Sequence, residues 1–383
     1  MARQPYKRLF TPGPLTTSRT VKEAMLVDLG SREDEFIAVV RDVRQRLLKV
    51  GGVSQTQGYE AVLLQGSGTF GIEAVLSSAI PPHDKPLILV NGAYGERMLA
   101  IAARHGLAAD ALRWPENQIT DPAAVQRRIE EDPAITHVAV VHSETSTGLL
   151  NPIEEIGSRV KAARRSFIVD AMSSFGAVPL SLESSHIDFL ISSANKCLEG
   201  VPGFCFVLAR KESLQACQGN ARTLSLDLFE QWRGLEANGQ FRFTPPTHAI
   251  LAFAQALREL DAEGGVAGRA KRYRANHAAL MAGMTSLGFR PFLPPEHQGW
   301  VISAFHDPGD PAFQFEEFYQ RLARRGLIIY PGKLGQIPCF RIGNIGRLTA
   351  NDIHELLDAV AAVLQAMNVA VPVAPPRLDP ANP

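Results

Sequence analysis

Short apolar runs alternate with helix-like segments through the first two thirds of the chain. Runs of strand length that are apolar at successive positions occur at 61–65, 87–91, 137–142, 166–170, 187–192 and 203–208. Because both faces of each run are apolar, we expect strands that are buried between layers of helices. Helical patterns at 71–80 and 92–106 follow the first two runs. The pattern predicts an α/β fold with a mainly parallel sheet sandwiched by helices.

The pattern changes after about residue 245. Helices are predicted at 248–263 and 266–287, each followed by glycine, and at 351–367, with strand-like runs at 299–305, 327–330 and 339–342. This mixture predicts a smaller α+β domain at the C-terminal end. The predicted parts are an N-terminal arm (1–14), a large domain (15–263), a small C-terminal domain (264–370) and a Pro-rich tail that we expect to be disordered (371–383).

The composition is that of a globular protein, and the 383 residues suggest about two domains. Basic and acidic residues number 39 each, which argues against a nucleic-acid-binding protein. Basic stretches at 159–165 and 269–274 are expected on solvated helix faces. The four cysteines form no C-x-x-C pair. We therefore expect no disulfide framework, no metal site and a reducing compartment.

The sequence contains no recognisable targeting segment or membrane span. The basic residues near the N-terminus are not followed by the apolar stretch that signal peptides carry. The longest apolar runs are much shorter than the roughly 20 residues that cross a bilayer. We expect a soluble cytoplasmic protein with no membrane partner.

Residues 66–71, Gly-Ser-Gly-Thr-Phe-Gly, lie between a predicted strand and a predicted helix. Small residues there allow backbone N–H groups and hydroxyls to bind a phosphate at the helix N-terminus. The same letters match the G-x-G-x-x-G of dinucleotide sites, but such a site needs an acidic residue after the next strand. That strand ends at Asn91-Gly92. A phosphate cradle, a dinucleotide site and a plain tight turn all stay open for this motif alone.

Three charged residues lie in or just after predicted strands. Asp170 ends a strand, where it can point into a ligand crevice or cap the next helix. Lys196 follows a strand and is either a Schiff-base lysine or an ordinary surface residue. Arg341 lies within a strand and either binds an anion with its planar fork or forms a structural ion pair. Together with a phosphate cradle, these residues are the set that pyridoxal phosphate (PLP) chemistry requires.

The sequence resembles the 2-aminoethylphosphonate–pyruvate transaminase family, in the class V group of fold-type-I PLP-dependent aminotransferases. The segments that carry the resemblance run in order from about residue 9 to 346 and are FTPGPLTTSRTVKEAM, LLQGSGTFGIEAVL, NGAYGERM, HSETSTGLLNP, VDAMSSFGAVP, SSANKCLEGVPGF, SLDLFEQW, RFTPPTH, YPGK and FRIGNIG. VDAMSSFG together with SSANKC separates this family from cysteine desulfurases and alanine–glyoxylate transaminases. The resemblance implies an enzyme of phosphonate catabolism that transfers the amino group of 2-aminoethylphosphonate to pyruvate. Phosphonoacetaldehyde and L-alanine are the implied products of this ping-pong reaction.

The resemblance also implies roles for individual residues. Lys196 is expected to form the Schiff base with PLP and to shuttle the proton, Asp170 to pair with the pyridine nitrogen, and Arg341 to bind the anionic end of the substrate. The other implied cofactor contacts are phosphate binding by Ser67, Gly68, Thr69 and Ser193, ring stacking by Tyr94, a hydrogen bond from Thr145 to the ring hydroxyl, and a contact of Asn195 with the ring oxygen or the phosphate. Thr244 is expected to reach the phosphate of the neighbouring subunit's cofactor, which implies a homodimer with shared sites.

Other functions compete with this interpretation. A transaminase for another small donor, such as one for alanine–glyoxylate exchange, has the same fold. An NAD-dependent dehydrogenase is supported by the glycine pattern alone, and a non-catalytic protein of this fold is expected to lack Lys196 or Asp170. Desulfurase chemistry needs an exposed, mobile thiol, whereas Cys339 is followed directly by an apolar strand. His142, which ends a predicted strand, is either packed structurally or lines the pocket.

Overall fold

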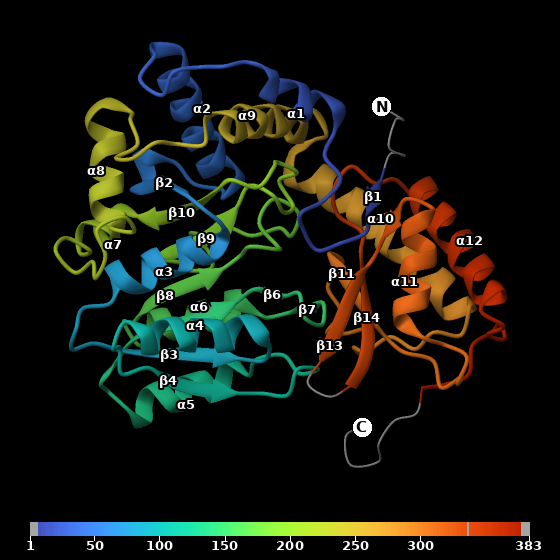
Figure 1. The fold of residues 1–383 in the computed structure, drawn as a ribbon. Coiled ribbons are helices and arrows are strands. Elements are labelled where there is room, and N and C mark those ends of the chain that lie inside the picture. Colours follow the sequence, from blue (N-terminus) through green and yellow to red (C-terminus); the bar gives the residue numbers. More distant parts are fainter. Residues whose placement is uncertain (1–6, 335–336, 377–383) are drawn as a thin grey trace. The chain divides into compact units, whose positions relative to one another are not determined.

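The chain divides into two compact units, which we call the large unit and the small unit. The computed structural model describes residues 7–334 and 337–376 (Figure 1). The large unit comprises residues 17–144 and 150–269, and the small unit comprises residues 1–16, 145–149 and 270–383. The division at 269/270 lies close to the domain boundary predicted at 263/264. The described part of the predicted N-terminal arm clusters with the small unit.

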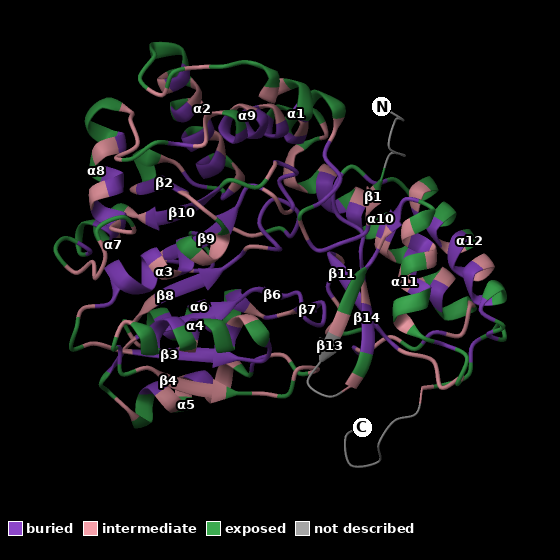
Figure 2. Cartoon of the chain, in the orientation of Figure 1, coloured by how far each residue is buried: buried purple, intermediate pink, exposed green. Residues whose placement is uncertain are grey.

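A seven-stranded sheet forms the centre of the large unit, in the order β2-β10-β9-β8-β5-β3-β4. Its strands are β2 (Tyr59–Gln65), β3 (Lys85–Val90), β4 (Asp110–Arg113), β5 (Ile135–Val141), β8 (Ser166–Asp170), β9 (Phe189–Ser193) and β10 (Phe204–Arg210). The pairs β3–β4, β3–β5, β5–β8 and β8–β9 are parallel, and only β10 runs antiparallel to its neighbours β2 and β9. The central strands are buried along almost their whole length (Figure 2), which confirms the predicted α/β class with a mainly parallel sheet.

Helices connect the strands of the large unit and cover the sheet. They are α1 (Arg19–Glu23), α2 (Asp34–Val50), α3 (Gly68–Ala79), α4 (Ala93–Arg104), α5 (Pro122–Glu131), α6 (Ile153–Ala162), α7 (Lys211–Gln215), α8 (Leu228–Asn238) and α9 (Thr247–Ala262), with 3-10 turns at Ala24–Leu26 and Gln55–Gln57. Helix α3 packs on β9 and β10, α4 on β3, and α6 on β8. The predicted glycine signal after α4 is confirmed, because Gly106 adopts a left-handed φ of 68° just beyond the helix.

The small unit contains a three-stranded antiparallel sheet in the order β11-β14-β13. Its strands are β11 (Ile302–His306), β13 (Tyr330–Leu334) and β14 (Ile337–Gly343), and β1 (Arg8–Leu9) pairs in parallel with β12 (Leu327–Ile328). Three helices accompany them, α10 (Gly265–Ser286), α11 (Phe315–Arg324) and α12 (Ala350–Ala366), of which α10 begins in the large unit. Phe340 stacks edge-on against Phe289 at 5.5 Å in the core. The chain also forms the short strands β6 (Ser143–Glu144) and β7 (Leu149–Leu150).

Part of the predicted Pro-rich tail packs onto the small unit. Val373 is buried, and its N–H donates to the carbonyl of Leu287 at 2.8 Å. The carbonyl of Ala374 accepts from Gly309 N. Residues 377–383, the rest of the predicted tail, lie outside the described residues.

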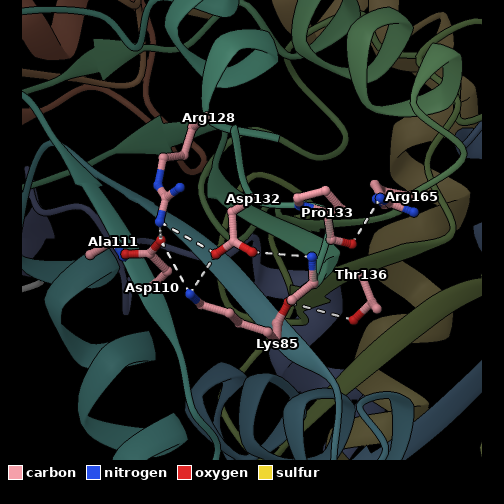
Figure 3. A network of polar contacts seen from close by, with 9 residues as sticks. Lys85, Asp110, Ala111, Arg128, Asp132, Pro133, Thr136 and Arg165 are labelled. Carbon is pink, nitrogen blue, oxygen red and sulfur yellow. Dashed lines mark hydrogen bonds and ion pairs between the residues drawn. The ribbon is translucent and has the colours of Figure 1, made fainter. Parts of the chain in front are cut away.

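An ion-pair network joins the amino-terminal ends of β3 and β4 to the last turn of α5 (Figure 3). The Lys85 ammonium lies 2.6 Å from Asp132 Oδ2 and 3.8 Å from Asp110 Oδ2, and the Arg128 guanidinium pairs with both carboxylates. The hydrogen bond from Lys85 lowers the pKa of Asp132. In open α/β sheets ligands bind at the carboxyl ends of the strands. This network lies at the amino-terminal ends of the strands, opposite their carboxyl ends, so we interpret it as structural.

In the part of the chain that the structure describes, no helix combines the length and the apolar character needed to cross a membrane.

Candidate active site

The sequence-predicted residues of the large unit gather where its strands end. Asp170 is the last residue of β8 and Ser193 the last residue of β9, and these two strands are parallel neighbours. Helix α3 begins directly after β2, and α4 begins just after β3. Open α/β sheets bind their ligands at these carboxyl ends of the strands.

The turn from β2 into α3 forms a small cup at the N-terminus of the helix. Gly66 adopts a φ of 103°, which only glycine takes without strain. Ser67 is the N-cap of α3, and its side chain makes no capping hydrogen bond. A Cβ at Gly68 would lie 2.2 Å from the sulfur of Met172, so a larger residue there would require the Met172 side chain to move. Thr69 Oγ1 accepts from Arg97 Nη1 at 3.4 Å, so a hydroxyl, a cation and the first helical N–H groups lie around one helix end.

The dinucleotide interpretation of this glycine motif does not fit the structure. The strand that follows it, β3, is followed by Asn91 rather than an acid. Asn91 Nδ2 donates to Asn151 Oδ1 at 2.8 Å and to the carbonyl of Gln118, so Asn91 is used structurally. The acidic partner that a dinucleotide site requires is missing at this place.

Asp170 is a buried acid with one side-chain hydrogen bond. Its side chain is almost fully enclosed, and Oδ1 accepts from Met172 N at 2.9 Å. Burial raises the pKa of this carboxyl to about 6, against the opposing effects of that hydrogen bond and the charges of Lys196 and Arg97. The segment after Asp170 forms turns and not a helix, so Asp170 is no helix cap.

Lys196 lies in the turn that follows β9, close enough to Asp170 for its charge to act on that carboxyl. Its side chain is half-buried, as is that of Asn195 beside it. The carbonyl of Lys196 accepts from Glu199 N at 2.8 Å, and the carbonyl of Ala194 accepts from Gly200 N at 2.9 Å. The turn is therefore closed by its own backbone hydrogen bonds and presents Lys196 at the strand ends.

Tyr94 lies in the first turn of α4, with its ring half-buried. Its backbone N–H donates to Glu144 Oε2 at 3.2 Å, which fixes the start of the helix. The guanidinium of Arg97 lies over the ring, 4.9 Å from its centroid. Arg97 therefore contacts both Tyr94 and Thr69, a role that the sequence analysis missed. Its spacing of three residues from Tyr94, which places both on one helix face, was the available signal.

Thr244 lies beside the cup, in a pocket that Gly66 also lines, and is exposed. Gln65 Nε2 donates to the carbonyls of Phe243 and Thr244, at 2.8 and 3.2 Å. Thr244 lines a pocket of about 560 Å³ together with Leu64, Gln65, Gly66, Phe70, Ser225, Leu226 and Phe243.

Two predicted residues, Arg341 and Thr145, belong to the small unit, and the structure brings them together. Arg341 lies in β14, opposite Tyr330 in β13. Its Nη1 donates to the carbonyl of Thr145 at 2.9 Å, and its Nε and Nη2 donate to the carbonyl of Pro331 at 3.2 and 2.8 Å. Among the described residues no carboxylate pairs with Arg341, so its positive charge is fixed in place and not neutralised by an ion pair. Arg341 is therefore not part of a structural ion pair among the described residues, and its nitrogens donate to backbone carbonyls instead.

The remaining candidates are packed inside the fold. His142 is buried, and burial lowers its pKa to about 3, so the ring is neutral at physiological pH. The thiol of Cys197 donates to the carbonyl of Ser173 at 3.2 Å, and Cys339 is buried as well. Neither is the exposed thiol that desulfurase chemistry needs. Within residues 7–334 and 337–376, no cluster of three or more His, Cys, Asp or Glu side chains could hold a metal ion.

A helix N-terminus that could hold a phosphate, a buried acid and a nearby lysine at the carboxyl ends of a mainly parallel sheet fit a PLP-dependent enzyme. The family profile described as aminotransferase class-V matches residues 22–346, so the chain belongs to this family. The protein is therefore an aminotransferase that uses PLP, with the fold-type-I architecture that the sequence predicted.

Relatives with similar sequences are named for one particular aminotransferase reaction. A relative from Salmonella heidelberg (strain SL476), named 2-aminoethylphosphonate–pyruvate transaminase, is 53% identical over 361 residues, which cover 94% of this chain and 98% of the relative. A relative of the same name from Salmonella typhimurium is 53% identical over 93% of this chain and 97% of its own length. These relatives confirm the family resemblance found in the sequence.

Solved structures agree on the fold. The ureidoglycine–glyoxylate aminotransferase of Bacillus subtilis superposes with a TM-score of 0.88 at 26% identity, covering 96% of this chain and 95% of that one. The pyridoxamine–pyruvate aminotransferase of Mesorhizobium loti gives a TM-score of 0.88 at 25% identity, covering 97% and 95%. Aminotransferases of this fold thus act on different amino donors, so the donor must be inferred from evidence other than the fold.

Proposed function

We propose that this protein transfers the amino group of 2-aminoethylphosphonate to pyruvate, giving phosphonoacetaldehyde and L-alanine. The observation that carries the proposal is the 53% identity, over 94% of the chain, with a relative named for this reaction. The fixed and unpaired charge of Arg341 supports it, because donor and acceptor are both anions.

The residues of the large unit fit PLP by their chemistry. When bound, PLP supplies an electron sink for the substrate's amino carbon. Asp170 has one side-chain hydrogen bond, and its buried carboxylate can pair with a protonated ring nitrogen. Such a pairing offsets the burial that raises its pKa. Lys196 holds the cofactor covalently and, once released, moves a proton to and from the substrate carbon.

The other predicted contacts form the rest of this proposal. Ser67, Gly68, Thr69 and Ser193 bind the phosphate, and the free Ser67 hydroxyl at the α3 N-terminus supports this role. Tyr94 stacks on the cofactor ring, Thr145 bonds its hydroxyl, and Asn195 contacts the ring oxygen or the phosphate. Because donor and acceptor visit one site in turn, the kinetics are ping-pong.

We further propose a homodimer in which Thr244 reaches the phosphate of the partner subunit's cofactor. Thr244 is exposed, and the adjacent Phe243 is 44% exposed beside the pocket next to the cup. An exposed aromatic ring next to an apolar pocket is typical of an interface. We place the enzyme in the cytoplasm, since its four cysteines are all free thiols, as in proteins of reducing compartments.

The replacement Arg341→Lys is expected to lower kcat/KM for both half-reactions by about 10- to 100-fold, because the fork that binds two oxygens at once is lost. The two half-reactions are measured separately, with donor alone and with the pyridoxamine form plus pyruvate. Arg324→Lys, at an exposed position of α11, is the matched control and should leave both rates unchanged. If only one half-reaction weakens, the other substrate is bound by a different cation.

An assay of alanine formation tests the proposed reaction. The purified holoenzyme is given pyruvate and, in separate reactions, 2-aminoethylphosphonate, serine or another small amine as donor. Alanine formation with 2-aminoethylphosphonate at the highest kcat/KM supports the proposal. A preference for a different donor, or exchange between alanine and glyoxylate at a higher kcat/KM, contradicts it and favours the other transaminase.

A further inference from the structure

A buried charged cluster lies where α10 begins, beside the turn that carries Lys196. Its members are Arg269, which is fully buried, Glu199, which is 2% exposed, and Glu263. The basic stretch 269–274 was expected on a solvated helix face, and for Arg269 that expectation was wrong. Gly264 and Gly265 both adopt positive φ, and this turn leads the chain from α9 into α10, which begins at Gly265.

Arg269 donates hydrogen bonds to two acceptors in this cluster and forms an ion pair with a third. Its Nη1 donates to the carbonyl of Cys197 at 2.5 Å and lies 3.5 Å from Glu199 Oε1. Its Nε donates to Glu263 Oε2 at 2.7 Å. A planar guanidinium matches three acceptors in fixed directions, which the single ammonium of a lysine does not. The guanidinium also provides the positive charge that the buried carboxylate of Glu199 and the partly buried carboxylate of Glu263 require.

The acceptor carbonyl and one of the carboxylates belong to the turn of Lys196. Cys197 is the next residue, and Glu199 N donates to the carbonyl of Lys196. Glu199 adopts a φ of 61°, a left-handed conformation that a non-glycine residue holds only when its surroundings fix it. Arg269 binds both the backbone before this residue and its side chain.

We propose that Arg269 is a positioning residue that holds the Lys196 turn in the geometry needed for the covalent link to the cofactor. The inference rests on the proposed role of Lys196. Arg269 acts through the carbonyl of Cys197 and the side chain of Glu199, and a small displacement of this turn moves the Lys196 amine directly. Misplacing a reacting group by about 1 Å costs roughly 100-fold in rate.

The test compares Arg269→Met with Arg44→Met, which matches it closely. Arg44 is also a buried arginine of the large unit, and it bonds a carbonyl (Ala61) and two carboxylates (Glu60 and Glu236) away from the turn. For each variant we would measure the dissociation constant for PLP, the pH midpoint of the visible band of the bound cofactor, and the melting temperature. The pH midpoint reports the protonation of the Lys196 nitrogen.

Both variants should melt at lower temperature, but only Arg269→Met should bind PLP at least about ten-fold more weakly. Its pH midpoint should rise, because the carboxylates of Glu199 and Glu263 lose their cation and favour a protonated Lys196 nitrogen. Arg269→Lys keeps the charge and should restore most of the midpoint and part of the affinity. It also keeps the test valid if Arg269→Met does not fold.

The proposal is supported if Arg269→Met changes the dissociation constant for PLP or the pH midpoint and Arg44→Met does not. If the Arg269 variants match Arg44→Met in both affinity and midpoint, the positioning role is contradicted. The variant Lys196→Ala distinguishes failure of the Arg269 proposal from failure of the proposed function. If Lys196→Ala retains the wild-type band, the assignment of Lys196 itself is wrong.

Discussion

Lys196→Ala is expected to lose at least about 10⁴-fold in turnover while the protein stays folded. The side chain is half-buried and lies in a turn whose own backbone hydrogen bonds remain in the variant, so truncation removes the amine and little packing. Without the amine, the cofactor is not held covalently and the proton of the substrate carbon has no acceptor. Turnover with 2-aminoethylphosphonate and pyruvate, measured together with the melting temperature, checks both parts.

Lys161→Ala is the control for this variant, because Lys161 is an exposed residue of α6 and should leave turnover unchanged. Near-normal turnover of Lys196→Ala would remove the chemical basis of the whole assignment. A variant that is inactive and also unfolded would show that the turn depends on the lysine for structure, contrary to its half-buried position.

Asp170→Asn is expected to have opposite effects on activity and on the stability of the apoprotein. Burial raises the pKa of Asp170 from 3.8 to about 6, so the fold favours the protonated acid. The resulting cost of ionisation is about 3 kcal/mol, at 1.36 kcal/mol per pKa unit. This cost is absent below pH 3.8, develops as the pH rises to about 6, and is fully present above it.

The neutral asparagine avoids this cost. The apoprotein of Asp170→Asn should therefore be up to about 3 kcal/mol more stable than wild type at pH 7.5, and the difference should vanish towards pH 4. Turnover should fall by about 10²- to 10⁴-fold, because an amide does not keep the ring nitrogen protonated. Denaturant unfolding of both apoproteins at the two pH values measures the first effect. A less stable variant at pH 7.5, or an unchanged turnover, contradicts the account of Asp170.

The sequence predicts the strands that are buried on both faces more reliably than the partly exposed strand β4. The runs that become β8 and β9 carry apolar residues on both faces, and the structure places the strands within two residues of the predicted bounds. The edge strand β4, with sequence Asp-Ala-Leu-Arg, carries a charge at each end and has no such pattern. The antiparallel direction of β10 also has no sequence signal, because its residues are apolar whichever way the strand runs.

The candidate site residues also differ in how well the sequence reveals them. Asp170 and Lys196 were recognisable as candidates because Asp170 ends an apolar strand and Lys196 follows one by a few residues. Arg269 was not, because its sequence neighbours look like an ordinary basic helix face, and its burial is decided by Cys197 and Glu199, about 70 residues earlier in the chain. Local sequence carries propensity and periodicity, whereas contacts between distant segments appear only in the folded chain. The packing of Val373 in a Pro-rich segment is a second example.

The most direct test of the central claim is an absorbance spectrum of the purified, PLP-loaded protein before and after addition of 2-aminoethylphosphonate without pyruvate. The account predicts that the band of the Lys196-linked cofactor converts to that of the pyridoxamine form and returns when pyruvate is added. A band that ignores this donor but responds to alanine or serine would contradict the proposed substrate. The absence of any such band in the presence of PLP would contradict the role of Lys196.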